Sequence, residues 1–189
     1  VYMSNTNKGY TYSLTAQIKK SFAWGLSLDA AYTFGHSYTV FDGTSSVAYS
    51  NWKYNYARDT NNPELAVSGF DIPHRIMASA NYNKSYGKNN RWATHASLIF
   101  EGRAGQPYSL TYYYTKTLPT QGGGSSMNGD NYNGNDLIYI PSQADMDKMN
   151  WKSDKDKANF EEFIQSDKRM RENRGKYSER NQFRMPFES

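Results

Sequence analysis

The stretch "SGFDIPHRIMASANY", residues 68–82, decides how the rest of this sequence is interpreted. After Pro73, the even positions read His, Ile, Ala, Ala and Tyr, and the odd positions read Arg, Met, Ser and Asn. Because successive side chains of a strand point to opposite faces, this alternation predicts a strand over about 73–83 with one mostly apolar face. Pro73 fits the first position of a strand, where no backbone donor is needed. Both a half-buried strand of a soluble sheet and a strand of a membrane barrel show this pattern.

The same two-residue period recurs in three further segments and predicts strands at about 10–20, 22–36 and 91–115. The connections between the strands alternate in length. Short turns follow the first and third strands, whereas long polar loops occupy about 37–72 and 116–178. Outer-membrane barrels have short turns on the periplasmic side and long loops outside, so this asymmetry favours a barrel over a soluble sandwich.

The second long loop also contains a helical pattern. Ser142 with Asp145, and Ser153 with Asp156, have the spacing of helix N-caps, which predicts a small helical insertion over about 142–174. The predicted fold class is therefore all-β. It is an antiparallel transmembrane β-barrel segment of about four to five strands with long external loops, and residues 1–189 form part of one barrel domain. Because the smallest common barrels have about eight strands, such a segment is not expected to close alone.

Aromatic residues mark the two expected membrane interfaces. Trp24 and Phe34 belong to the same predicted strand. In a strand tilted by about 40°, the distance between them along the membrane normal is about 25 Å, which matches the height of the apolar band of a barrel. The expected interface aromatics are Phe22, Trp24, Tyr82 and Trp92 on the short-turn side, and Tyr10, Tyr12, Tyr32 and Phe34 on the loop side. Membrane lipid is accordingly an expected partner of the even-numbered faces.

The odd-numbered faces carry the polar side chains and are expected to line a water-filled lumen. The lumen-facing candidates are Arg75, Ser79, Asn81, His95, Glu101 and Arg103. If the residue numbers of paired positions in the third and fourth strands sum to about 176, Arg75 lies directly opposite Glu101 as a favourable charge pair.

Composition excludes several other classes of protein. The chain has 189 residues, a hydrophobic fraction of 37% and a mean hydropathy of -0.90, so any core is thin. Cysteine is absent, which rules out disulfides and thiolate metal sites. The sequence contains no run of about 18 apolar residues, so no transmembrane helix is predicted. The net charge of +4 is scattered among acidic residues, so no nucleic-acid partner is expected.

Few residues suggest ligand binding or chemistry. The tyrosines of "YSLTYYYT" offer flat rings with polar tips, and the external ligand-contact candidates are Tyr108, Tyr112, Tyr113 and Tyr114. The loop "GDNYNGNDL" invites a calcium site, but the spacing from Asp130 does not fit an EF-hand, and an Asn/Gly turn is favoured. No catalytic, metal or cofactor residues are predicted, and the chain is not expected to be an enzyme.

Four phrases also resemble a known family. "GFDIPHRIMASANY", "FEGRAGQPYSLTYYY", "NGDNYNGNDLIYIPSQADM" and "RGKYSERNQFRMPFES" are similar to the C-terminal barrel region of TonB-dependent outer-membrane receptors, in particular the Oar-like group of Bacteroidetes. The resemblance runs from about Tyr10 to the end of the chain.

This resemblance implies a barrel of about 22 strands with an N-terminal plug, in the outer membrane of a Gram-negative bacterium. It also implies uptake of a large or scarce nutrient. The implied partners are the remainder of the parent barrel and plug, an inner-membrane energy-coupling protein that acts through the N-terminal region, and a surface lipoprotein. The chain itself is expected to be an internal or C-terminal fragment of the barrel.

Three alternatives remain open at this point. A passive porin-type barrel would show the same strands. A secreted soluble β-sandwich that binds glycans would pack its even-numbered faces against each other rather than against lipid. A secreted hydrolase is the least supported, because no acid and base pair can be placed.

Overall fold

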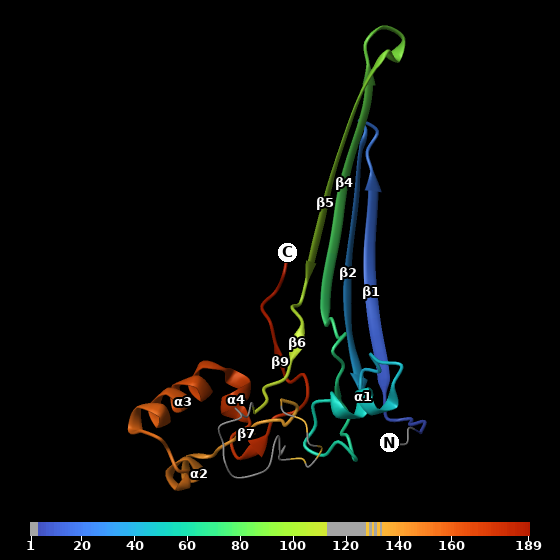
Figure 1. Cartoon of the computed structure of the whole chain (residues 1–189). Coiled ribbons are helices and arrows are strands. Elements are labelled where there is room, and N and C mark those ends of the chain that lie inside the picture. The colour runs from blue at the N-terminus through green and yellow to red at the C-terminus, as the bar shows by residue number, and fades with distance from the viewer. Residues whose placement is uncertain (1–3, 113–127, 129, 131, 133) are drawn as a thin grey trace. The chain divides into compact units, whose positions relative to one another are not determined.

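The computed structural model describes residues 4–112, 128, 130, 132 and 134–189 (Figure 1). Their contacts divide the chain into two units. The strand unit comprises Tyr10–Tyr38, Phe70–Gln106 and Arg184–Ser189, and the loop unit comprises Val1–Gly9, Thr39–Gly69 and Pro107–Phe183. The long strands belong to the strand unit, and the connections that the sequence predicts as external loops belong mostly to the loop unit.

Four long antiparallel strands build the strand unit. They are β1 (Tyr10–Ser21), β2 (Leu26–Thr39), β4 (His74–Tyr86) and β5 (Trp92–Arg103), and they lie side by side in the order β1-β2-β4-β5 (Figure 1). This is the up-and-down order of a barrel wall. The described residues form an open sheet with β1 and β5 at its edges and do not close a barrel.

The register joins even-numbered positions to even-numbered positions throughout this sheet. Ile18 lies opposite Ala30, Ala30 opposite Ala78, and Ala78 opposite Phe100. Because side chains alternate along each strand, the even positions of all four strands share one face and the odd positions share the other. The predicted parity of the two faces is therefore confirmed.

The first turn lies later than the alternation predicts. The pattern starts the second strand at residue 22, but β1 continues to Ser21 and β2 begins at Leu26. The turn is closed by bonds from the Phe22 amide to the Leu26 carbonyl, 2.8 Å, and from the Gly25 amide to the Phe22 carbonyl, 3.0 Å. Gly25 has a φ of +101°, and a side chain there would collide with the Asn83 carbonyl oxygen at 2.0 Å. Glycine is required at this turn, and the turn replaces the strand start that the alternation of Phe22 and Trp24 predicts.

The fourth strand ends earlier than predicted. The pattern extends it to about residue 115, but β5 stops at Arg103. Beyond it, Gly105 lies against the backbone of the C-terminal segment, where an added side chain would meet the Pro186 carbonyl oxygen at 2.2 Å. The chain then pairs through β6 (Pro107–Tyr108) with β9 (Phe183–Arg184).

The predicted register of the third and fourth strands is wrong by two. Arg75 lies opposite Arg103, and Met77 lies opposite Glu101, so paired residue numbers sum to 178. The reason is the turn between Tyr86 and Trp92, where Gly87 and the short helix η1 (Lys88–Asn90) reverse the chain. Asn89 and Asn90 both adopt positive φ, 58° and 52°, which asparagine tolerates better than most residues.

The loop unit contains short elements around a small core. They are α1 (Ala48–Lys53), β3 (Ala66–Val67), β7 (Tyr139–Ile140), α2 (Gln143–Lys148), α3 (Asp154–Ser166), α4 (Lys168–Glu172) and β8 (Lys176–Tyr177), with β6 and Phe183 of β9. The core residues are Ile138, Ile140, Met146, Ile164, Met170 and Phe183. α1 and β3 occupy a connection that reads as an irregular loop in the sequence.

The helical insertion begins at the capping residues that the sequence suggests. The Ser142 hydroxyl accepts from the Asp145 amide and the Asp145 carboxylate accepts from the Ser142 amide, which is a complete capping box at the start of α2. Ser153 caps α3 through the Asp156 amide. No helix in the described part of the chain is long and apolar enough to cross a membrane.

Candidate functional site

The odd-numbered face of the strand unit carries a ladder of polar contacts between neighbouring strands. Between β1 and β2, the hydroxyls of Thr15 and Thr33 lie 2.9 Å apart, and Gln17 donates to Asp29 at 2.8 Å. Between β4 and β5, Ser97 donates to Asn81 at 2.8 Å. Each contact joins residues on the same face of adjacent strands, where cross-strand neighbours are close enough to bond. This face is therefore hydrophilic along most of its length.

Charged residues extend the ladder at the loop-side end of β4 and β5. Arg75 does not face Glu101 directly, but it reaches Glu101 diagonally, with Nη2 to Oε1 at 2.8 Å and Nε to Oε1 at 3.1 Å. Its direct neighbour Arg103 pairs instead with Glu188, at 3.2 Å. Two carboxylates thus balance two guanidinium groups that the register brings together.

All six lumen-facing candidates lie on this odd-numbered face. They are Arg75, Ser79, Asn81, His95, Glu101 and Arg103. His95 contacts Asn83 through Nδ1. The face also includes Met77 and Ile99, so its polarity is not complete.

The even-numbered face is apolar along its middle and aromatic at both ends. On the loop side, the ring of Phe34 lies 6.3 Å from Tyr12 and 5.5 Å from His74, and the Tyr32 hydroxyl lies 2.8 Å from His74 Nδ1. On the turn side, Trp24 lies 5.7 Å from Phe22. Between these groups, Leu14, Ile18 and Leu98 remain at least 71% exposed. Large apolar side chains left this exposed mark a surface that contacts something other than water.

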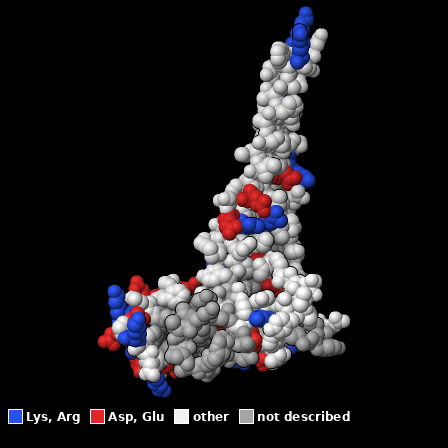
Figure 2. All heavy atoms as spheres, viewed as in Figure 1, with Lys and Arg blue, Asp and Glu red and all other residues white. Residues whose placement is uncertain are grey.

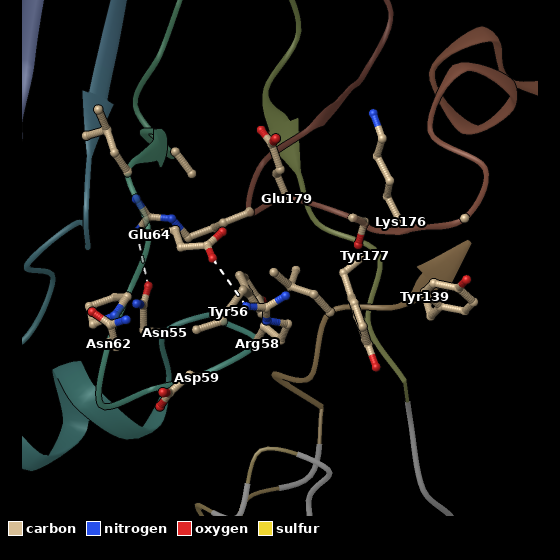
Figure 3. A pocket seen from close by; sticks show the side chains of 18 residues that line it. Asn55, Tyr56, Arg58, Asp59, Asn62, Glu64, Tyr139, Lys176, Tyr177 and Glu179 are labelled. Carbon is tan, nitrogen blue, oxygen red and sulfur yellow. Dashed lines mark hydrogen bonds and ion pairs between the residues drawn. The ribbon is translucent and has the colours of Figure 1, made fainter. Parts of the chain in front are cut away.

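A pocket of about 420 Å³ lies within the loop unit (Figure 3). Its walls come from residues 55–66, from Leu137 and Tyr139, and from residues 175–180. The strands β7 and β8 bring two of these segments together, because Tyr139 pairs with Tyr177. A pocket of this size is within the range that holds small ligands.

Tyrosine rings and charged groups of both signs line this pocket. The rings of Tyr139 and Tyr177 lie 5.2 Å apart at an angle of 55°, and the Arg58 guanidinium lies 5.8 Å from the Tyr177 ring centre. Arg58 also lies 3.7 Å from Glu64, but both side chains are more than 60% exposed and the pair adds little stability. Lys176 and Glu179 add one further charge of each sign. Such a lining can stack against a flat ligand surface and bond its polar groups.

Arg180 forms the buried end of the pocket. It is 4% exposed, and its guanidinium donates to Asn55 Oδ1 at 3.0 Å and to the Thr39 carbonyl. Burial lowers the pKa of Arg180 from its usual value, and Asp42, 3.9 Å away, partly opposes this change. The Arg180 Nε atom is buried without a partner among the described residues.

The predicted external tyrosines do not belong to this pocket. Tyr108 packs 5.7 Å from the Phe183 ring. Tyr112 is half-buried against the core, its hydroxyl accepts from the Tyr139 amide at 3.0 Å, and burial raises its pKa. Tyr112 is therefore held by structural contacts, while Tyr113 and Tyr114 lie outside the described residues.

The pocket residues were not predicted from the sequence, because they come from segments that lie far apart along the chain. The sequence signals that could have indicated the pocket are Tyr139, within the short apolar run "LIYI", and Tyr177, within the segment "RGKYSER". Among the described residues, no three His, Asp or Glu side chains are grouped to hold a metal ion. In the loop considered for calcium, the Asp130 carboxylate instead accepts from the Tyr132 amide and the Asn135 side chain, at 2.8 and 2.5 Å.

Comparison with known proteins gave one finding. A family model described as "Outer membrane beta barrel domain" matches residues 1–187. No curated protein and no solved structure matches the chain significantly.

Proposed function

Because the chain belongs to the outer membrane beta barrel domain family, and hence to the outer membrane of a Gram-negative bacterium, we propose that it forms part of the wall of a receptor and transporter barrel. In this proposal the barrel takes up a large or scarce nutrient with energy coupled through TonB. The even-numbered face contacts lipid and the odd-numbered face lines the lumen. The chain catalyses no reaction and uses no cofactor.

The observation that carries the proposal is the difference between the two faces of one sheet. The odd face bonds Thr15 to Thr33 and Asn81 to Ser97, and it balances Arg75 with Glu101. The even face leaves Leu14, Ile18 and Leu98 more than 70% exposed, whereas Ile99 is the one large apolar side chain this exposed among the described residues of the odd face. A soluble sheet would cover such residues, whereas a barrel wall places them in lipid and places the polar face around water. The family assignment therefore does not support the secreted sandwich that the sequence left open.

The TonB-coupled receptor and the passive porin differ in how well the lumen conducts ions. A receptor closed by a plug gives little steady ion current, whereas an open porin conducts without any energy source. The test is the conductance of the full protein, purified from outer membranes, in a planar lipid bilayer. Low conductance, together with nutrient uptake that stops when the inner-membrane proton gradient is collapsed, supports the receptor. A large steady current that does not depend on energy contradicts it and favours the porin.

We further propose that the pocket of the loop unit contacts the ligand. Tyr177 is the best residue to test, because it is 39% exposed and Tyr139 is also held by its bond to Asp145. Tyr177→Ala should weaken binding by about fivefold or more, since stacking on one ring contributes about 1–3 kcal/mol. Tyr49→Ala is the matched control, because Tyr49 is a similarly exposed tyrosine on α1 outside the pocket.

The binding measurement uses isothermal titration calorimetry with two defined probe sets. One set contains neutral linear oligosaccharides of four to seven sugars, and the other contains zwitterionic peptides of three to five residues. A probe that binds the parent protein and the Tyr49→Ala variant equally, but the Tyr177→Ala variant more weakly, supports the pocket. Equal binding by all three proteins, or no binding to any probe, contradicts its role as the ligand contact.

A further inference from the structure

Unpaired cations gather at the short-turn end of the strand unit. They are Lys20 at the end of β1, Lys84 near the end of β4, and Lys88 and Arg91 in the turn between β4 and β5. None of these side chains forms an ion pair in the described part of the chain. The nearby carboxylate of Asp29 is already bound to Lys19, at 3.2 Å, and to Gln17 on the odd-numbered face. The turn end is therefore cationic without an internal counter-charge.

Two of these cations share the even-numbered face with an aromatic belt. Lys20 lies with its ammonium 5.9 Å from the centre of the Phe22 ring. Trp24 lies 6.0 Å from Tyr82, and Lys84 follows Tyr82 on the same face. The next even-numbered positions of this hairpin hold two more rings, Tyr86 opposite Trp92. Cations and aromatic rings thus alternate along the border of the apolar face.

The turn between β4 and β5 extends farther than the turn between β1 and β2. The Asn83 amide donates to the Gly25 carbonyl at 2.8 Å, so Asn83 is level with the first turn. The paired strands continue to Tyr86 and Trp92, which adds about 10 Å beyond that level. Figure 2 shows the result: Lys and Arg atoms gather at the tip of this hairpin, and an uncharged stretch follows them along the strands.

We propose that Lys20, Lys84, Lys88 and Arg91 form a binding surface for anionic phospholipid headgroups in the periplasmic leaflet of the outer membrane. Short barrel turns face the periplasm, so this end of the apolar face meets the phosphates of that leaflet. Tyr and Trp rings lie at the level of the headgroups, and long lysine stems extend from the apolar surface toward them. The four cations, which form no ion pair among the residues that the structure describes, complement the charge of an anionic headgroup. Zwitterionic lipids offer the same phosphate but carry their own ammonium group, so they are bound less well.

The inference rests on the lipid-facing orientation of the even face, and it does not require that the barrel transports anything. The test therefore measures lipid composition only. The full protein is extracted from outer membranes in polymer nanodiscs, and mass spectrometry compares the ratio of anionic to zwitterionic phospholipid with that of the bulk membrane. We expect anionic phospholipid to be enriched about fivefold. This ratio corresponds to about 1 kcal/mol, the attraction of one lysine to an anionic membrane surface.

Matched variants separate this surface from the total charge of the protein. The variant Lys20→Gln, Lys84→Gln, Lys88→Gln, which keeps only Arg91 of the four cations, should lower the ratio most of the way to the bulk value. The control variant Lys148→Gln, Lys152→Gln, Lys155→Gln removes the same charge from α2, from the α2–α3 connection and from α3 in the loop unit, and should keep the enrichment. Arginine at positions 20, 84 and 88 should keep it too, because it retains the charge.

Three results would overturn the proposal. The first is a ratio of anionic to zwitterionic phospholipid around the parent protein that equals the ratio of the bulk membrane. The second is enrichment that remains in the turn-side glutamine variant. The third is a loss of enrichment in the control variant that equals the loss in the turn-side variant. If the turn-side glutamine variant does not reach the membrane, the parent and arginine variants still decide the outcome, since both must show enrichment.

Discussion

Arg184 and Asp71, 113 residues apart in the sequence, form an ion pair in which Nη2 lies 2.5 Å from Oδ2 and the Asp71 side chain is fully buried. The second Asp71 oxygen accepts from the Ser37 amide at 2.7 Å, and His36 Nδ1 lies 3.3 Å from the first. Arg184 also donates to the carbonyls of Asp71 and Gly105, both at 2.9 Å. One buried charge pair therefore fastens the C-terminal segment to the end of β2 and to the chain that enters β4.

Removing either partner of this pair should destabilise the strand unit strongly. Asp71→Asn or Arg184→Met leaves one buried charge without compensation, which costs about 3–5 kcal/mol in comparable cases. The double variant should cost less than the sum of the two single variants. Denaturant titration in detergent micelles, followed by tryptophan fluorescence, measures these differences. Lys168→Met is the control, since its partner Glu172 is 3.7 Å away on an exposed helix surface and the change should cost less than about 1 kcal/mol.

The register of β4 and β5 can be tested with engineered disulfides, because the chain has no cysteine. Asn81 lies opposite Ser97, whereas the register predicted from sequence would place it opposite His95. Cross-strand partners have Cβ atoms about 4.5–5.5 Å apart, while diagonal neighbours are about 7–8 Å apart. The pair Asn81→Cys and Ser97→Cys should oxidise rapidly, and Asn81→Cys with His95→Cys should not. The reverse order of rates, seen by gel mobility without reductant, would restore the predicted register.

Acid should unfold the helical insertion. Bonds from Ser142 and Tyr139 lower the pKa of Asp145 below its ordinary 3.8, and the bond from Arg174 lowers the pKa of Glu161 below 4.5. A lowered folded pKa means that each carboxylate stabilises the fold above its unfolded pKa and loses this effect as pH falls through the folded pKa. Helical circular dichroism should therefore decrease as pH falls from about 4.5 toward 2.

Substitutions identify which carboxylates cause this acid transition. Glu161→Gln and Asp145→Asn should start with less helix at neutral pH and should show a smaller further loss in acid. Glu162→Gln, next to Glu161 on α3, is the control and should keep the full transition. Identical acid profiles for all three variants would refute the assignment.

Two adjacent alanines of β2 offer a matched test of the faces. Ala30 lies on the even face opposite Ile18 and Ala78, and Ala31 lies on the odd face opposite Gln17 and Met77. Arginine on the lipid face near the middle of the membrane costs about 2–4 kcal/mol, whereas arginine toward a water-filled lumen costs little. Ala30→Arg should therefore reduce the protein recovered in outer membranes much more than Ala31→Arg. Equal recovery of the two variants would count against a lipid-facing even side.

The parity of the strands could be predicted from sequence, because successive side chains of a strand always point to opposite faces of the sheet. Ile76, Ala78 and Ala80 share one face whatever the register is. The turn positions were harder, because Phe22 and Trp24 continue the alternation through a reversal that only Gly25 reveals. A two-residue slip in register also preserves parity, so the pattern could not distinguish Arg103 from Glu101 as the partner of Arg75.

The pocket and the Asp71 anchor could not be predicted in the same way. Tyr139 meets Tyr177, and Asp71 meets Arg184, only after the chain has folded over long distances. Neither pair has a local spacing that a motif could detect. Sequence reasoning instead favoured Tyr112, whose ring packs against the core of the loop unit.

The orientation of the two faces of β4 is the central claim, and single cysteines placed in turn at positions 76 to 81 test it most directly. Each cysteine carries a spin label in the full protein reconstituted in lipid vesicles, and its collision rates with oxygen and with a water-soluble nickel complex are measured. We predict that oxygen, which concentrates in lipid, contacts labels at 76, 78 and 80 more often, and that the nickel complex contacts labels at 77, 79 and 81 more often. Rates without a two-residue period, or greater nickel contact at the even positions, would contradict a barrel wall with lipid on its even side and water on its odd side.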